Sequence, residues 1–245
     1  MFKCLVSGGC SFSYGFNLPD RNTRYAKLLA DHMGVELFDV SASGMNNEFI
    51  AAATIIGVNK ALLKYKPNEI LVVHGWTSTE RFEFFNPDTG NVGTGYTNPF
   101  HHRHGDQKQK DKDRSDFIRK NLWSHAYGHY KLITSFISLS SYCEVNNIKI
   151  IHKLNVNSPY AKLPNISKPH SMVCNKDYNN FFLTGKYLSE FEMLCRSKSF
   201  ADITSKKIYH LKPDVDTHPN ASGNKIWAER LIRKHPEFSN LSSKE

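Results

Sequence analysis

The segment Phe2-Lys3-Cys4-Leu5-Val6-Ser7-Gly8-Gly9-Cys10-Ser11-Phe12-Ser13-Tyr14-Gly15 joins an apolar run to a serine that lies between glycines. The apolar part, Phe2 to Val6, is typical of a buried first strand. A serine on a turn directly after such a strand can project its hydroxyl above the end of a sheet. Ser11 is therefore a candidate nucleophile, and it needs a base that accepts its proton.

A candidate base lies far downstream, in Asp214-Val215-Asp216-Thr217-His218-Pro219. Gly223 and a helical pattern follow this segment. Loops at the carboxyl edge of a parallel sheet converge, so a histidine just before a C-terminal helix can reach a serine after the first strand. Because one segment supplies a hydroxyl nucleophile and the other a base that can accept its proton, the sequence favours a serine hydrolase.

Strand-like apolar runs alternate with helical patterns along the chain. After the first strand we expect strands at about 36–40, 69–74 and 149–152, and a short edge strand at Lys207–Leu211. The expected helices cover about 24–33, 47–65, 116–142, 181–194 and 222–235. This alternation predicts an α/β fold with a parallel sheet of about five strands and helices on both faces, doubly wound around a point near the first strand.

We predict a single domain over residues 1–245, since a chain of this length can bury a substantial core. The alternating pattern fails from Gly75 to about Arg114, where turn signals such as Asn86-Pro87-Asp88-Thr89-Gly90 accumulate. A long loop insertion at about 75–114 is therefore expected. Loops of this length are often lids or binding loops.

Composition narrows the cellular setting of the protein. No apolar run approaches the roughly 18 residues that a membrane-spanning helix needs, and the N-terminus lacks the apolar core of a secretory signal. We therefore expect a cytoplasmic protein with no membrane partner. The five cysteines are an odd number without a C-x-x-C pair, which indicates free thiols.

The formal net charge of +9 raises the question of a nucleic-acid partner. Much of this charge is dispersed along the chain. The densest basic region, His101 to Lys120, is interrupted by aspartates and is typical of a solvated loop. A nucleic-acid partner is therefore not expected.

Several histidines suggest a competing metal interpretation. His125 and His129 stand four residues apart on an expected helix, which puts them on one face. No glutamate lies between them as in H-E-x-x-H, and His101, His102 and His104 belong to the expected loop. We favour solvent-exposed histidines over a site, and we expect neither a metal nor a cofactor.

The segment Gly9-Cys10-Ser11-Phe12-Ser13-Tyr14-Gly15 resembles the first block of the SGNH (GDSL-type) hydrolases, G-D-S-[LI]-[ST]-x-G, with Cys10 in place of the aspartate. The resemblance implies a flavodoxin-like three-layer sandwich and assigns the nucleophile to Ser11. The replaced aspartate is not the family's triad acid. Similar G-C-S-F-S-x-G variants are associated with phage-encoded and bacterial hydrolases.

The second and third family blocks supply groups that bind the oxyanion. Ser43-Gly44-Met45-Asn46-Asn47 is similar to the second block, which implies that the Gly44 N–H is a donor beside the Ser11 N–H. A structural turn glycine would look identical, and Asn46 or Asn47 could instead cap the next helix. The third block, G-x-N-D, falls on Gly75-Trp76-Thr77-Ser78, where the hydroxyl of Thr77 stands in for the missing asparagine.

Neighbouring residues are candidates for contact with the substrate. Asn47, Trp76 and Arg81 lie close to these blocks, and ordinary packing at a loop base is the alternative for Trp76 and Arg81.

The last family block, D-x-x-H, implies that His218 is the base. Its spacing differs here, because Val215 stands three residues before His218. Asp216 and Asp214 flank that position, and we prefer Asp216 as the acid that orients the imidazole.

The resemblance therefore implies a serine esterase that hydrolyses a small ester, for example an acyl or acetyl group on a carbohydrate. The alternative is a catalytically degenerate SGNH fold that binds a glycan or another anionic ligand. The expected partner is a small-molecule or glycan ester, and the oligomeric state stays open.

Overall fold

The computed structural model describes residues 1–85, 92–96, 113, 116–118, 120–122, 125–156, 186–212 and 216–239. Within these residues, four parallel strands form a central sheet in the order β2-β1-β3-β6. They are β1 (Cys4–Gly9), β2 (Glu36–Asp39), β3 (Ile70–Trp76) and β6 (Lys149–Leu154). The predicted α/β fold class with a parallel sheet is confirmed. Strand β2 lies on one side of β1, and β3 and β6 lie on the other, so the strand order switches between β1 and β3.

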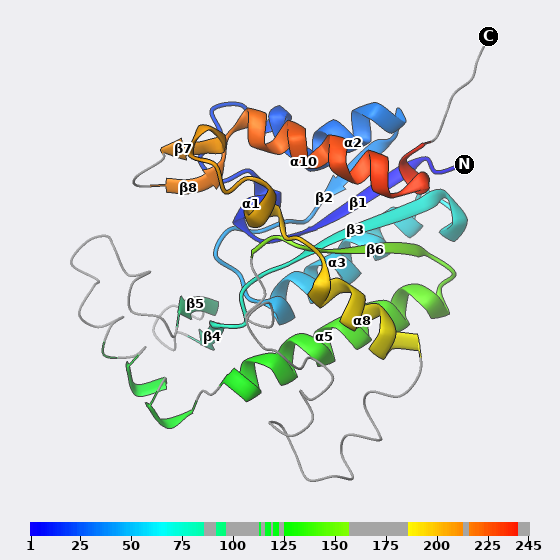
Figure 1. Cartoon of the computed structure of the whole chain (residues 1–245). Helices are drawn as coiled ribbons and strands as arrows, with labels where there is room; N and C mark the ends of the chain where they lie inside the picture. The colour runs from blue at the N-terminus through cyan, green and yellow to red at the C-terminus, as the bar shows by residue number, and fades with distance from the viewer. Residues whose placement is uncertain are drawn as a thin grey trace.

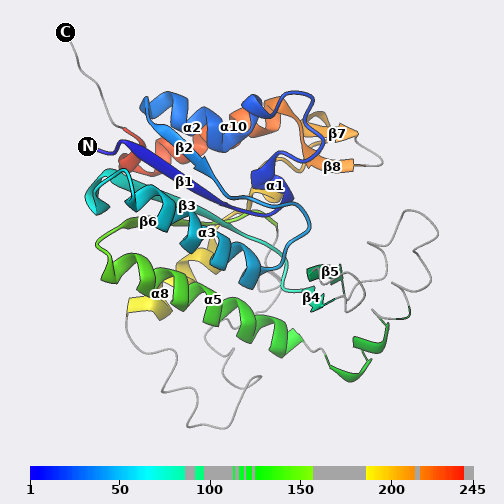
Figure 2. The same ribbon diagram turned by 180° about the vertical axis from the view of Figure 1, so that it is seen from behind.

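Helices cover both faces of the sheet, which gives three layers (Figure 1, Figure 2). One face carries α2 and α10, and the opposite face carries α3, α5 and α8. The helices of these two layers are α2 (Tyr25–Met33), α3 (Asn47–Leu62), α5 (His125–Val145), α8 (Lys186–Arg196) and α10 (Ala221–Lys234). The short elements between them are α1 (Ser11–Tyr14), α9 (Phe200–Ile203), η1 (Arg21–Thr23), η2 (Pro67–Glu69), η5 (Lys207–Tyr209) and η6 (Pro236–Phe238).

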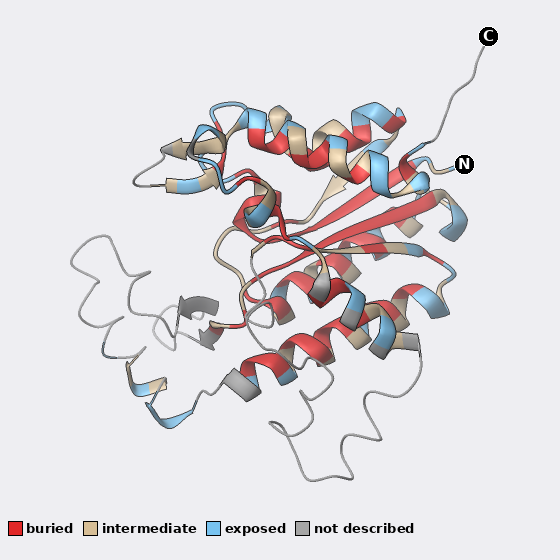
Figure 3. Cartoon of the chain, in the orientation of Figure 1, coloured by how far each residue is buried: buried red, intermediate tan, exposed pale blue. Residues whose placement is uncertain are grey.

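Two hydrophobic clusters fill the spaces between the layers, because successive side chains of a strand point to opposite faces. Val6 and Val72 belong to the cluster under α3 and α5. Leu5 and Leu71, their neighbours in sequence, belong to the cluster under α2 and α10. The strands β1 and β3 are therefore buried on both faces, as Figure 3 shows.

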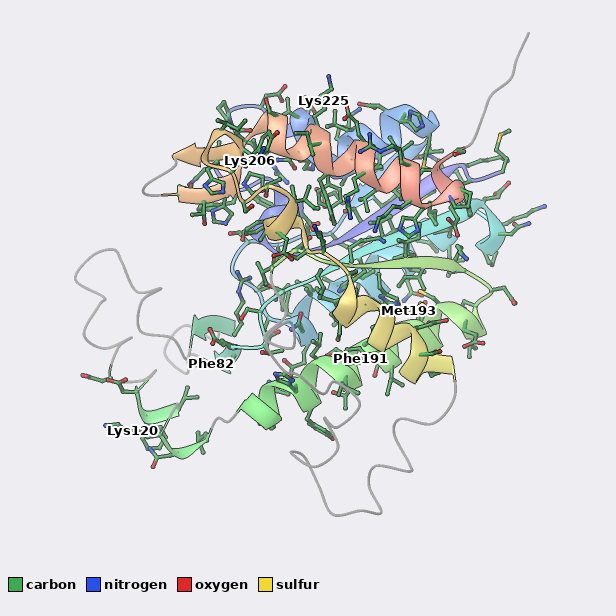
Figure 4. All side chains as sticks on the ribbon, in the orientation of Figure 1. Phe82, Lys120, Phe191, Met193, Lys206 and Lys225 are labelled. Carbon is green, nitrogen blue, oxygen red and sulfur yellow. The ribbon has the colours of Figure 1, made fainter. Side chains whose placement is uncertain are left out.

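Helix α8 extends the layer formed by α3 and α5. The ring of Phe191 packs against that of Phe136 on α5, with 5.3 Å between the centroids. Met193, two residues further on, is 66% exposed (Figure 4). One face of α8 is thus anchored in the core and the other faces solvent.

The prediction of a strand at the edge of the main sheet over Lys207–Leu211 is wrong. Residues His210–Lys212 form β7, which pairs antiparallel with β8 (Asp216–Pro219) in a separate hairpin. The described sheet therefore has four strands rather than about five, and β2 and β6 are its edges. A cleft of about 970 Å³ lies along β6, and its lining includes three lysines and three glutamates: Lys149, Lys153, Lys234, Glu144, Glu190 and Glu237.

The expected irregular loop at 75–114 is also partly wrong. Strand β3 continues to Trp76, and an antiparallel hairpin of β4 (Arg81–Phe85) and β5 (Val92–Tyr96) follows it. The intervening residues and most of the remainder of this segment lie outside the described part of the chain.

Two compositional expectations can be compared with the described residues. Cys4, Cys10, Cys143 and Cys195 are buried free thiols, as predicted, whereas Cys174 lies outside the described residues. None of the described helices has both the length and the apolar character that crossing a bilayer requires.

Candidate active site

The turn that carries Ser11, the candidate nucleophile, lies where β1 ends. We call residues Cys10 to Asn17 the nucleophile turn. Gly9 is the last residue of the strand, and Ser11 begins the single-turn helix α1 directly after it. Ser11 is 3% exposed, so its hydroxyl lies just beneath the surface at the carboxyl edge of the sheet. The switch in strand order between β1 and β3 makes this edge the usual place for a ligand site in an open α/β sheet.

The second half of the site comes from β8. Nε2 of His218 lies 2.9 Å from Oγ of Ser11, and Nδ1 lies 2.6 Å from Oδ1 of Asp216. Because alternate residues of a strand face the same side, a spacing of two residues lets Asp216 and His218 point together toward the nucleophile turn. This explains how D-x-H can replace D-x-x-H here. Asp214, the alternative acid, lies outside the described residues.

Both carboxylate oxygens of Asp216 accept hydrogen bonds. Oδ1 accepts from the ring and from the backbone N–H of His218, the latter at 2.9 Å, and Oδ2 accepts from Nδ2 of Asn17 at 2.9 Å. Partial burial pushes the pKa of the Asp216 carboxyl upward, but the hydrogen bonds from Asn17 and His218 hold it below its ordinary value. Asp216 is therefore ionised at neutral pH.

The imidazole of His218 contacts two aromatic rings. Its centroid is 5.2 Å from that of Phe12 and 5.1 Å from that of Phe16. The His218 side chain is 25% exposed. The ring is thus packed against two aromatic side chains and still reaches solvent, as a group that exchanges protons with a reactant must.

A buried network of hydrogen bonds connects Ser13, on α1, to the neighbouring strand ends and to α2. Asn155, directly after β6, donates from Nδ2 to Oγ of Ser13 at 2.8 Å and to the carbonyl of Gly75 at 3.1 Å. Oγ of Ser13 also hydrogen-bonds the hydroxyl of Tyr25 at 2.7 Å. The network therefore ties α1 to the ends of β3 and β6 and to α2.

A second asparagine connects the helix layer to β8. The backbone N–H of Tyr25 donates to Oδ1 of Asn224 at 3.0 Å, and Nδ2 of Asn224 donates to the carbonyl of Pro219 at 3.1 Å. Pro219 follows His218 directly. Sequence reasoning missed Asn155 and Asn224; the one available signal was the position of Asn155 at the end of an expected strand.

Two of the expected oxyanion donors lie on loops next to the turn. Gly44 has a φ of +81°, which favours glycine, in a loop that is held to β1 by a hydrogen bond from the Ala42 N–H to the carbonyl of Gly9. Thr77 directly follows β3 and is 3% exposed. Its hydroxyl has no hydrogen-bond partner among the described residues.

Asn47 and Arg81, two of the residues expected to contact substrate, hydrogen-bond the backbone of neighbouring loops. Asn47 exchanges hydrogen bonds with the backbone of Thr77, from which its Oδ1 accepts at 2.9 Å, and Arg81 donates from Nη1 to the carbonyl of Met45 at 2.9 Å. Both side chains thereby brace the loops that follow β2 and β3. Asn46 caps α3 by accepting from the N–H of Phe49.

Trp76 is fully buried in the core, which favours the packing alternative over contact with substrate. Its Nε1–H donates to Nδ1 of His152, and its ring packs against Phe136 and His74. At the end of a strand the apolar run alone did not determine which face this tryptophan occupies.

The metal interpretation gains no support from the part of the chain that the structure describes. There, no three His, Cys, Asp or Glu side chains are grouped so that they could hold an ion. His129 is buried, at 5% exposed. His101, His102, His104 and the side chain of His125 lie outside the described residues.

Solved structures with a similar fold include TesA, at 13% sequence identity and a TM-score of 0.51, with 96% of this chain and 99% of TesA covered. The psychrotrophic esterase EstA from a Pseudoalteromonas species matches at 14% identity and a TM-score of 0.49, covering 98% of this chain and 100% of EstA. A member of the lipolytic protein G-D-S-L family from Veillonella parvula matches at 10% identity and a TM-score of 0.47, covering 95% and 97%. The similarity to TesA shows a shared α/β fold.

A search of the curated proteins gives no match to the sequence. A protein-family model does match, over residues 20–237, which is most of the chain and includes Asp216 and His218 but begins after Ser11. The chain therefore belongs to the family of unknown function DUF6071.

Proposed function

We propose that this protein is a serine esterase of the SGNH type that hydrolyses a small ester through an acyl-enzyme. The observation that carries the proposal is the continuous chain of short contacts from Ser11 through His218 to Asp216. The fold that the chain shares with solved esterases and lipolytic proteins supports it. The substrate class that we propose is an acyl or acetyl ester, with esters on carbohydrates as the first candidates.

The hydrogen bonds determine which nitrogen of His218 carries the proton. An ionised carboxylate only accepts hydrogen bonds, so Nδ1 of His218 donates to Asp216. Nε2 is then the acceptor that faces the hydroxyl of Ser11. This is the tautomer that a general base needs at this position.

Acyl transfer follows from this arrangement. Nε2 of His218 takes the proton of Ser11 while Oγ attacks the ester carbonyl, and the resulting imidazolium is stabilised by Asp216. The protonated His218 then gives its proton to the leaving alcohol as the C–O bond breaks. A water molecule, deprotonated by the same imidazole, hydrolyses the acyl-enzyme and restores Ser11.

The negative charge on the tetrahedral intermediate requires hydrogen-bond donors. We assign this role to the backbone N–H groups of Ser11 and Gly44 and to the hydroxyl of Thr77, which is buried without a partner among the described residues. A hydroxyl rotates more freely than a side-chain amide, so Thr77 is a less preorganised donor than an asparagine would be.

Labelling with a fluorophosphonate probe tests the proposal directly, because such probes react with activated serines. We expect labelling of the wild-type protein on the peptide that contains Ser11, and its loss in Ser11→Ala and His218→Ala. Ser43→Ala, a change on the neighbouring loop beside Gly44, is the matched control and keeps the label. Labelling that persists in Ser11→Ala, or no labelling of a folded wild-type protein, overturns the proposal.

One observation favours a second candidate function. Because Thr77 occupies the place of the third-block asparagine, the same fold could act as a binding module for a glycan or another anionic ligand. A folded protein that resists the probe and binds such ligands equally well with and without Ser11 would establish this alternative.

A further inference from the structure

Asn17 has a backbone conformation that is uncommon for its residue type. Its φ is +60°, and Asn147 is the other described non-glycine residue with a positive φ. Side chains with a Cβ rarely occupy this left-handed region, although asparagine tolerates it better than most. A glycine would adopt the same turn without strain, so the backbone alone does not require an asparagine here.

The side chain of Asn17 supplies a second, independent observation. Its Nδ2 donates to Oδ2 of Asp216 at 2.9 Å, across 199 positions of sequence. The other carboxylate oxygen, Oδ1, is already shared by the ring and backbone of His218. Asn17 therefore holds the free end of the carboxylate, which could otherwise rotate about its terminal torsion.

Asn17 also belongs to the segment that carries the nucleophile. It lies six residues after Ser11, immediately beyond the ring of Phe16, which packs against His218. The hydrogen bond to Asp216 therefore joins the nucleophile turn to β8, independently of the contact between Ser11 and His218. An aspartate at position 17 would instead put a second carboxylate against Asp216, with no proton to donate at neutral pH.

We propose that Asn17 is a positioning residue for the esterase reaction: its left-handed backbone aims its amide at Oδ2 of Asp216 and so fixes the carboxylate that orients His218. This inference rests on the proposed function. Asn17 acts through Asp216 and does not touch the reacting atoms.

Two substitutions separate the amide from the backbone turn. Asn17→Gly keeps the left-handed conformation and removes the donor, whereas Asn17→Asp keeps the shape and replaces the donor with a charge. We expect Asn17→Gly to lower kcat, or the rate of fluorophosphonate labelling, by about 10-fold to 100-fold, by analogy with the loss of a residue that orients a metal ligand. KM and the unfolding midpoint stay near the wild-type values, and Asn17→Asp is slower still.

Asn147→Gly is the matched control, because it makes the same change at the other positive-φ asparagine, between α5 and β6. It should leave the labelling rate unchanged. In an Asp216→Ala background, Asn17→Gly should cause no further loss, since the group that it positions is absent. An equal loss in both backgrounds, or no loss in the wild-type background, overturns the proposal.

A spectroscopic readout distinguishes failure of this inference from failure of the proposed function. The proton on Nδ1 of His218, held between the ring and Asp216, should give a proton NMR signal that broadens or shifts in Asn17→Gly and not in Asn147→Gly. If the wild-type protein resists the probe but this signal responds, the esterase function fails, and with it the catalytic part of the inference, whereas the hydrogen-bonding role of Asn17 toward Asp216 stands. If the wild-type protein is labelled and Asn17→Gly changes neither rate nor signal, the positioning role fails alone.

Discussion

Oγ of Ser11 lies 2.9 Å from Nε2 of His218, although 207 positions of sequence separate the two residues. The contact exists because β1 lies in the middle of the sheet and the β7–β8 hairpin returns the end of the chain to its carboxyl edge. Hydrogen bonds from three asparagines connect the segments that meet at this edge: Asn17, Asn155 and Asn224. The geometry at Ser11 is therefore a property of the whole fold, and the following changes test its parts.

Replacing the acid should leave the fold intact and remove most of the rate. In Asp216→Asn the new amide can donate to Nδ1 of His218, which favours the wrong tautomer, and kcat should fall by about 10⁴-fold. Steady-state kinetics on a short ester, together with thermal unfolding, measures this. Asp214→Asn is the control: a comparable loss there would make Asp214 the acid and contradict the assignment.

Thr77→Val removes one hydroxyl at nearly constant volume. If that hydroxyl binds the oxyanion, kcat should fall by about 10²–10³-fold while KM changes little. Stability should not fall, because the hydroxyl is buried without a partner among the described residues. Thr79→Val deletes another buried hydroxyl of the same kind and should leave kcat unchanged; equal effects of the two valines would remove Thr77 from the oxyanion site.

Gly75→Ala should destabilise the protein through Asn155. A Cβ at position 75 would stand 2.7 Å from Cγ of Asn155 and closer still to its amide atoms. Such overpacking typically costs about 1–3 kcal/mol of unfolding free energy. The cost should shrink in an Asn155→Ala background, where the clashing atoms are absent, as urea unfolding of the four proteins would measure. Additive costs would mean that the alanine is excluded by something else.

The stability of the fold should fall as the pH drops below about 6.5, and His152 is one reason. Burial, with a contribution from the charge of Lys153, lowers the pKa of His152 to about 3, whereas an unfolded histidine has a pKa of about 6.5. Between these values the unfolded chain binds one more proton than the native protein, so unfolding becomes easier by about 1.4 kcal/mol per pH unit for this group.

His152→Gln tests this contribution. Glutamine keeps polar atoms near Trp76 and Ser140 but does not titrate in this range. Urea unfolding between pH 4.5 and 6 should therefore show a pH slope smaller by about one proton than in the wild type. Some slope remains, because burial also lowers the pKa of His74. An unchanged slope would mean that His152 is protonated in the native state.

Local patterns were enough to predict the framework of this molecule. Short apolar runs predicted β1, β3 and β6. Gly34 takes the left-handed conformation that ends α2, and the predicted helix at about 24–33 stops at the same place. Ser11 and His218 could be proposed because each lies in a recognisable segment at the end of a strand or before a helix.

Other features depend on tertiary structure and were missed for that reason. The sequence left Trp76 open between contact with substrate and ordinary packing, because an apolar residue at a strand end can face either way until the pairing with β6 decides its side. The segment that became β7 has the composition of an edge strand but pairs with β8 instead. Asn17 has no sequence signature, and Asn155 has only its position after an expected strand, since their roles arise from partners 199 and 142 positions away.

The position of the two key segments has a consequence during synthesis. Ser11 is translated before His218, and at about 5–20 residues per second the 207 positions between them take about 10–40 s to add. Throughout that interval the nascent chain has a serine with no imidazole beside it. The proposed nucleophile therefore gains its proposed base only after the β7–β8 hairpin has been synthesised and has docked against α1.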